Sequence, residues 1–204
     1  MPTLKKTKEE IIKKARELGV EYESKYMGCA QCTFSAVVDA LRWGGLELLP
    51  RDMEERLFSG LTLLSGGVAM TGDGSCGGIT GGVLALGIAM GISRDRQEED
   101  RSTRRAGYAA AWNGIVDKYY EKYNSLLCKD VQRKRFGKAY NLRVPEISEE
   151  FLRTSGVFDI RERTPDRSVC LTPECTIALA ARWAVESVLD EFEKGNLKGP
   201  FRLL

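Results

Sequence analysis

The sequence predicts an all-α fold, a single-domain bundle of about six helices with its cysteines gathered at one end. Apolar residues recur at spacings of three and four, and no alternating run is long enough to indicate a strand. Glycine and proline separate the periodic segments, as at helix ends. With 204 residues, 43% of them hydrophobic, the chain can bury one core, so we treat 1–204 as one domain.

The first predicted helix lies within residues 1–20 and covers the core. Thr7 and Glu10 form a capping box at its start, and Gly19 is expected to end it. Its apolar face consists of Ile11, Ile12, Ala15 and Leu18. This segment has no uninterrupted apolar region of the secretory type, so we expect a cytoplasmic protein.

The second helix begins near Cys29 and ends at Gly44 and Gly45. Cys29 and Cys32 are three residues apart and therefore share a face. That face continues through Ala36, Ala40 and Trp43.

The third helix opens with Pro50, a favourable first-turn residue, and ends before Gly66. Its predicted core face consists of Met53, Leu57, Leu61 and Leu64.

The segment GDGSCGGITGG, residues 72–82, surrounds Cys76 with six glycines. Glycine weakens a helix, so the high density of glycine around Cys76 requires a separate explanation. The fourth helix starts at Ser75 or Cys76, and its small residues form a strip that a neighbouring helix can approach closely. The strip consists of Gly78, Gly82, Ala85 and Ala89. Because residues 77–93 are short and glycine-rich for a membrane span, we expect a buried helix.

The fifth helix follows a segment of mixed charge and runs to about Leu127, with Cys128 at its end. Its inward candidates are Tyr108, Trp112, Ile115, Tyr119 and Leu126. Residues 129–168 are expected to form an elaborated surface connection with one short helix near SEEFLRT. The sixth helix begins with Thr172 as cap and Pro173 at its first position, and it ends before Gly195. Its core face consists of Ala178, Ala181, Val185, Val188 and Phe192.

The absence of histidine from the sequence restricts the chemistry. It excludes Ser-His-Asp and Cys-His catalysis and any metal site with a histidine ligand. A metal must then be held by sulfur or oxygen. The candidate sulfur atoms belong to six cysteines, Cys29, Cys32, Cys76, Cys128, Cys170 and Cys175. In a cytosolic chain of this length, reduced thiols that bind metal or perform redox chemistry are favoured over a disulfide framework.

Helix order predicts where four of these thiols meet. If helices two to six pack as antiparallel neighbours, the starts of helices two, four and six lie at the same end as the finish of helix five. Cys29, Cys76, Cys175 and Cys128 occupy those four positions. Three of them lie in the first turn of a helix, where the dipole favours the thiolate. The glycines around Cys76 would then let backbone approach a cluster and donate N–H bonds to its sulfur atoms.

These residues resemble a family of redox-active proteins whose pattern is C, CGAxxG, C, C. CAQC at 29–32 resembles the first motif, and CGGITG at 76–81 resembles the second with Gly78 in place of alanine. Cys128 and Cys175 are similar to the third and fourth cysteines. The resemblance spans roughly residues 20 to 190. It implies a helical domain with four functional cysteines and a redox role, often suggested to involve an iron–sulfur site.

A similar domain occurs beside haem-binding segments in split-Soret cytochromes. The haem part does not carry over, because the chain has no histidine. Cys32 and Cys170 are additional to the pattern, and either could replace a family ligand. For Cys170 we favour a small buried hydrophobe.

The leading functional hypothesis is an iron–sulfur cluster used in electron transfer, with Cys29, Cys76, Cys128 and Cys175 as ligands and Cys32 as a further candidate. A structural zinc site with four cysteines satisfies the same ligand count. Thiol–disulfide exchange by Cys29 and Cys32 is a third interpretation, in which no metal is needed. Whether the protein is an enzyme, and what its redox partner protein is, are left open.

Two further features bear on partners. The basic segment 129–143 could bind nucleic acid, but with a net charge of +2 a solvated face is favoured. The small-residue strip on helix four faces either its own bundle or a second subunit of a homo-oligomer. Asp73 is expected to cap helix four rather than tune Cys76.

Overall fold

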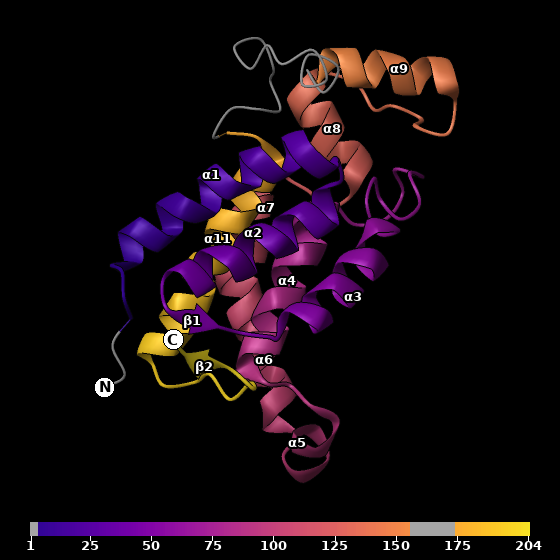
Figure 1. The fold of residues 1–204 in the computed structure, drawn as a ribbon. Helices are drawn as coiled ribbons and strands as arrows, with labels where there is room; N and C mark the ends of the chain where they lie inside the picture. Colours follow the sequence, from indigo (N-terminus) through magenta and orange to yellow (C-terminus); the bar gives the residue numbers. More distant parts are fainter. Residues whose placement is uncertain (1–3, 156–173) are drawn as a thin grey trace.

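A computed structural model describes residues 4–155 and 174–204, and within them the fold is all-α, as predicted (Figure 1). Four long helices form its centre. They are α1 (Lys8–Tyr26), α2 (Cys29–Trp43), α4 (Gly77–Met90) and α11 (Thr176–Glu193). Helix α2 packs against the other three, and α4 packs against α11. The early and late parts of the chain therefore share one core.

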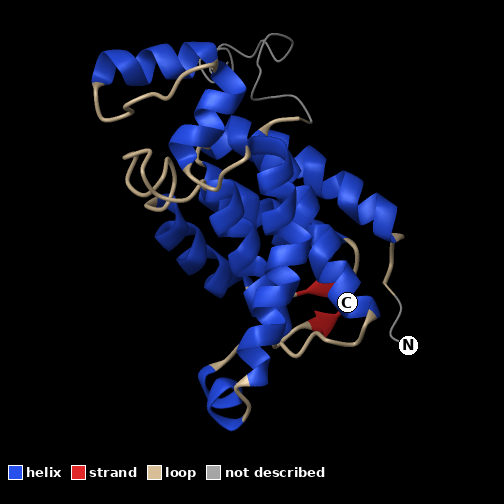
Figure 2. Cartoon of the chain, turned by 180° about the vertical axis from the view of Figure 1, so that it is seen from behind, coloured by secondary structure: helices blue, strands red, loops and turns tan. Residues whose placement is uncertain are grey.

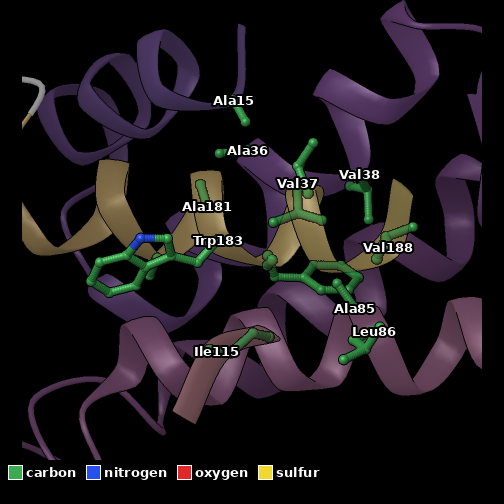
Figure 3. Close-up of a cluster of buried hydrophobic side chains, with 14 of the residues drawn as sticks. Ala15, Ala36, Val37, Val38, Ala85, Leu86, Ile115, Ala181, Trp183 and Val188 are labelled. Carbon is green, nitrogen blue, oxygen red and sulfur yellow. The ribbon is translucent and has the colours of Figure 1, made fainter. Parts of the chain in front are cut away.

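The core combines many small and medium-sized apolar side chains with a few large ones such as Trp183 (Figure 3). Ala36 and Val37 of α2, Ala85 of α4 and Ala181 of α11 are all fully buried. Small residues at these facing positions let the helix backbones approach closely, which increases the contact between them.

Helix α1 runs through Gly19, so the predicted end of the first helix is wrong. The helix continues to Tyr26 and ends at Met27, a non-glycine residue with a φ of 51°. Gly19 serves packing instead, because a Cβ there would lie 2.7 Å from the Cα of Ala178 in α11. The glycine thus marks a helix crossing rather than a helix end.

Helix α3 (Arg51–Thr62) lies beside α2, with Pro50 at its N-cap. Its predicted core face is only partly confirmed, because Leu61 is buried whereas Met53 is 46% exposed. A two-residue antiparallel pair, β1 (Leu46–Glu47) with β2 (Arg202–Leu203), joins the segment before α3 to the C-terminus (Figure 2).

Helix α5 (Arg94–Glu99) lies within the segment of mixed charge, and the predicted fifth helix after it consists of three successive pieces. They are α6 (Ser102–Ala111), the π-helical turn η1 (Trp112–Val116) and α7 (Asp117–Tyr123). The last piece ends at Asn124, which adopts a φ of 56°. The helix therefore stops short of the predicted Leu127.

The π turn explains which predicted inward residues are correct. Ile115 and Tyr119 are fully buried, whereas Tyr108 is 66% and Trp112 is 54% exposed. A regular helix would place these four residues on one face, but the extra residue in a π turn breaks that register. Small Gly107 faces the core in place of Tyr108, and a Cβ there would lie 2.1 Å from Ile92.

Two helices lie within the segment expected to be an irregular connection. Helix α8 (Cys128–Phe136) starts at Cys128, which therefore begins a helix instead of ending one. Helix α9 (Pro145–Thr154) matches the short helix predicted near SEEFLRT. The two meet through Phe136 and Phe151, whose ring centroids are 5.8 Å apart. Figure 1 shows them together at one end of the bundle.

The last helix, α11, begins at Thr176 with Cys175 as its N-cap. The predicted cap Thr172 and the predicted first-turn Pro173 lie outside the described residues. Among the described helices, none has both the length and the apolar character required to cross a membrane.

Candidate functional site

The first turns of α2 and α4 meet directly, and two glycines make the meeting possible. A Cβ on Gly77 would lie 2.4 Å from the Sγ of Cys29 and 2.7 Å from the N of Ala30. A Cβ on Gly81 would lie 2.3 Å from the Ala30 carbonyl oxygen. Atoms do not approach so closely, so only glycine allows this crossing. The glycines beside Cys76 therefore allow the backbone of α2 to pass close to this cysteine.

The predicted strip of small residues on α4 faces the protein's own bundle at Gly78 and Gly82. A Cβ on Gly82 would lie 3.2 Å from the Cβ of Ala184 in α11. At Gly78 the nearest atom is the hydroxyl of Tyr119, only 2.4 Å from where a Cβ would be. Gly78, which replaces the alanine of the CGAxxG pattern, thus leaves room for a tyrosine hydroxyl 3.8 Å from the Cys76 sulfur.

Cys128 is held beside Cys76 by a short antiparallel bridge between Ser75 and Leu127. The Cys76 N–H donates to the Leu126 carbonyl at 2.7 Å, and the Cys128 N–H donates to the Gly74 carbonyl at 2.9 Å. Two cysteines 52 positions apart in the sequence are thereby fixed at one end of the bundle.

A left-handed turn between α3 and the glycine-rich segment completes this end of the bundle. Five consecutive residues, 66–70, have φ between 48° and 75°. Three of them are not glycine, and Val68 is β-branched, so the turn is strained. It brings Gly66 and Met70 to the site, and Gly67 packs against the Cβ of Cys128.

These elements enclose a cavity of about 440 Å³, and three thiols line it. Cys29 is half-buried, whereas Cys76 and Cys128 are 4% and 6% exposed. We call these three residues the cavity thiols. They are contributed by the starts of α2, α4 and α8, so three of the four predicted ligands face one space.

The cavity thiols differ in their protonation. Cys29 and Cys76 are hydrogen-bonded to each other, and this bond lowers the pKa of Cys76 while raising that of Cys29. The Gly78 N–H and the Tyr119 hydroxyl also lower the pKa of Cys76, against the opposing effect of burial. Burial and nearby Cys76 raise the pKa of Tyr119, which keeps its hydroxyl a donor. Within the pair, ionisation is therefore favoured at Cys76 over Cys29.

Cys128, like Cys29, has a raised pKa. Burial, with a smaller electrostatic contribution from Cys29, raises the pKa of Cys128 to about 12. The side-chain amide of Gln132 donates to its sulfur at 3.6 Å and acts in the opposite direction. The Gln132 carbonyl oxygen accepts a bond from the Tyr140 N–H at 2.8 Å, which fixes the amide orientation.

Cys32 and Cys175 form a second cluster, which we call the sealed pair. Both are 0% exposed and pack with Ile177 and Ala178, and Cys29 lies against the edge of this cluster. Cys32 donates to the Tyr22 carbonyl at 3.3 Å, and the Ala178 N–H donates to Cys175 at 3.4 Å. Cys170 lies outside the described residues.

The predicted set of four sulfur ligands is therefore divided between two places. Cys175 is at the expected end of the bundle, since the next residue, Thr176, lines the cavity, but its own side chain belongs to the sealed pair. Within residues 4–155 and 174–204, no group of three or more His, Cys, Asp or Glu side chains is arranged to hold a metal ion. Cys29 interacts with the thiol of Cys76, which lies at the start of another helix, and not only with Cys32 of its own CAQC segment.

Sequence reasoning missed several residues of the site. Tyr119 was expected to face inward but not to reach a thiol, and nothing in its spacing indicates that contact. No pattern in the sequence predicted that Gln132 would contact a thiol, and none predicted the left-handed turn. The expectation that Asp73 caps α4 is wrong, because Asp73 pairs with Lys129 at 2.7 Å and Cys76 occupies the N-cap.

Together, the fold and the site define a class: an all-α protein with reduced thiols gathered at one end of the bundle. The comparison with protein families agrees, since the family model described as "Putative redox-active protein (C_GCAxxG_C_C)" matches residues 27–156. This is more than half of the chain, and the chain belongs to that family. The matched range contains all three cavity thiols and ends before Cys175. No curated protein and no solved structure matches the chain.

Proposed function

We propose that this redox-active protein works as a dithiol, in which Cys29 and Cys76 alternate between two thiols and one disulfide. The observation that carries the proposal is geometric: the Cys29 sulfur lies against Gly77, the residue that follows Cys76, and both cysteines line the cavity. A thiol beside a thiolate is the reactant pair of thiol–disulfide exchange. Cys76 is the member of the pair whose pKa is lowered, and Cys29 is the more exposed of the two residues.

The reaction with a disulfide substrate then has two steps. Cys29 attacks one substrate sulfur as its proton passes to Cys76, so that a mixed disulfide forms and the first substrate thiolate leaves. That thiolate takes the proton from Cys76. The Cys76 thiolate next attacks the Cys29 sulfur, forming the Cys29–Cys76 bond and releasing the second substrate thiolate. Two electrons and one proton pass from the protein to the substrate.

The order of attack is tested by trapping the mixed disulfide. Cys76→Ser should accumulate substrate bound to Cys29, because the second step is lost, but more slowly than the wild type reacts, because the proton acceptor is gone. Cys29→Ser should accumulate no substrate on Cys76. Cys32→Ser is the matched control and should still form the Cys29–Cys76 bond. Peptide mapping by mass spectrometry measures each product. A Cys29–Cys32 bond in the wild type, or turnover that survives Cys76→Ser, would reject the proposal.

A second candidate function is the expected sulfur-ligated metal centre, an iron–sulfur cluster or zinc. It is favoured by one observation, the third thiol of Cys128 in the same cavity. Cys29, Cys76 and Cys128 would supply ligands to a group that carries electrons when bound, or to structural zinc. The fit is incomplete because Cys175 belongs to the sealed pair, so we derive no step through such a centre.

Metal analysis of anoxically purified protein separates the two candidates. The dithiol proposal expects full disulfide chemistry in metal-free protein. The metal centre expects visible absorption or bound zinc that is lost in Cys128→Ser, and no disulfide chemistry once the metal is removed.

A further inference from the structure

The walls of the cavity opposite the thiols are apolar. These walls are formed by side chains from α8, α9, the segment between them, α11, the left-handed turn and the end of α1. The apolar side chains are Met27, Met70, Val131, Phe136, Leu142, Phe151, Leu152 and Ile177. A volume of about 440 Å³ falls in the range of cavities that enclose small molecules.

Most polar side chains in the cavity wall already have partners within the protein. Ser65 accepts from the Ala30 N–H at 3.1 Å and donates to Gln31 at 2.7 Å, while Gln31 donates to the Met27 carbonyl at 3.1 Å. On the opposite side, Gln132 bonds Cys128 and Tyr140, as described above. These groups hold the wall together, and few hydrogen bonds are left for a ligand.

Among the described lining residues, Glu23 and Arg135 are the charged ones, and both are engaged. The Glu23 carboxylate accepts from the Gly28 N–H at 3.1 Å, and Arg135 donates to the Thr176 hydroxyl at 2.9 Å. Arg135 acts electrostatically on Glu23, so these opposite charges leave the described wall with no net charge to compensate a charged ligand, which would lose its water on entering.

We propose that the substrate of the Cys29–Cys76 dithiol is a small, uncharged, apolar disulfide, and this inference rests on the proposed function. Its apolar body occupies the space between Phe136 and Met70, and its sulfur atoms reach the cavity thiols. Because the first attack is made by Cys29, which is half-buried and lines the cavity, the substrate disulfide must enter the cavity, and a small disulfide does so more readily than one fixed on the surface of a protein. Electron and proton transfer follow the two steps given above, with the substrate released as one thiol and one thiolate.

The test compares three disulfides on the full-length reduced protein. Dithiodipyridine is aromatic and neutral, dithiobis(nitrobenzoate) is aromatic with two carboxylates, and insulin carries protein disulfides. Each rate is divided by the rate of the same disulfide with free mercaptoethanol, so that differences in intrinsic reactivity between the disulfides cancel. The neutral compound should be favoured over the dianion by at least about tenfold, because the dianion must be desolvated.

Variants of the cavity wall test the location. Leu152→Glu should slow the neutral disulfide by about tenfold, because it places a charge in the apolar wall. Ile147→Glu adds the same charge on the same helix, away from the described lining, and should change the rate less than about twofold. Leu152→Lys should shift the preference toward the dianion. Far-ultraviolet circular dichroism verifies that each variant is folded.

The outcomes separate the inference from the function beneath it. Equal normalised rates for the neutral compound and the dianion, or faster reaction with insulin, would overturn the apolar substrate while leaving the dithiol intact. Equal effects of the two glutamate variants would also overturn it. If none of the three disulfides yields a Cys29–Cys76 bond, the proposed function itself fails.

Discussion

Cys29 and Cys32 lie one turn apart on α2, yet they belong to different thiol clusters. Cys29 lines the cavity and is hydrogen-bonded to Cys76, whereas Cys32 is fully buried against Tyr22 and Cys175. Cys76 and Cys175 make the same point, since both are N-caps but only Cys76 lines the cavity. A position at a helix start therefore does not make a thiol reactive. The neighbouring helix decides whether the sulfur faces a cavity or a sealed core.

The two clusters nevertheless depend on the same packing device. Each lies beside a crossing of two helices that a glycine permits, Gly77 at the cavity thiols and Gly19 at the sealed pair. At Gly77 the closest atom is the sulfur of Cys29, whereas at Gly19 it is the backbone of Ala178. The cavity crossing therefore positions a reactive atom, and the other crossing only closes the core.

The largest expected difference between the clusters is in their reactivity toward a small alkylating reagent. Iodoacetamide should label Cys29 at least about 100-fold faster than Cys32, because Cys29 has access from the cavity and a neighbouring thiol, Cys76, that can take its proton. Cys32 is fully buried, and burial raises its pKa. Mass spectrometry at early times measures both rates in the same sample. Comparable rates would remove the distinction between cavity thiols and sealed pair.

The glycine crossings give the next largest effect. Gly77→Ala should lower the free energy of unfolding by roughly 1–3 kcal/mol, because α2 and α4 must separate, and Gly19→Ala should cost a similar amount. Gly87→Ala on α4 is the matched control, since nothing lies within 4 Å of a Cβ there, and it should stabilise by about 0.5–1 kcal/mol. Urea denaturation measures all three.

The same variants also separate the roles of the two crossings. Only Gly77→Ala should change the iodoacetamide rate of Cys29, because only that crossing contacts a cavity thiol. A change of equal size in Gly19→Ala would mean that the clusters are coupled.

High pH tests the buried state of Cys128. Its pKa is about 12 in the folded protein and about 9 in the unfolded chain, so the folded state binds more protons between these values. The stabilisation is fully present below pH 9 and is lost as the pH rises toward 12. From pH 8 to pH 11, Cys128→Ser should lose about 2 kcal/mol less stability than the wild type. Identical pH profiles would show that Cys128 is not held protonated by burial.

Local patterns in the sequence predicted the helices and the gathering of three thiols. Helical spacing located α2, α4 and α11, and the order of the helix ends placed Cys29, Cys76, Cys128 and Cys175 together, of which the first three line one cavity. The division of the cysteines was not predictable, because the sequence does not tell which neighbour Cys32 or Cys175 faces. Gly19 shows the same limit, since a glycine at a helix crossing and a glycine at a helix end look alike in sequence. The π turn at Trp112–Val116 changes the register by one residue, which no periodicity reveals.

The smallest expected effect distinguishes the cavity thiols from one another, through the Tyr119 hydroxyl at Cys76. Removing this donor in Tyr119→Phe should raise the pKa of Cys76, because the hydroxyl favours the thiolate. At neutral pH the dithiol should react about two- to fivefold more slowly, the factor that corresponds to a weak hydrogen bond of ~0.5–1 kcal/mol.

Gly78→Ala should act in the same direction by a different route, because its methyl group occupies the place of the hydroxyl. In the double variant the two effects should not add, since the second change removes an interaction that is already lost. Additive effects in this cycle, measured by thiolate absorbance against pH and by the exchange rate, would mean that Gly78 and Tyr119 do not act on Cys76 through a shared contact.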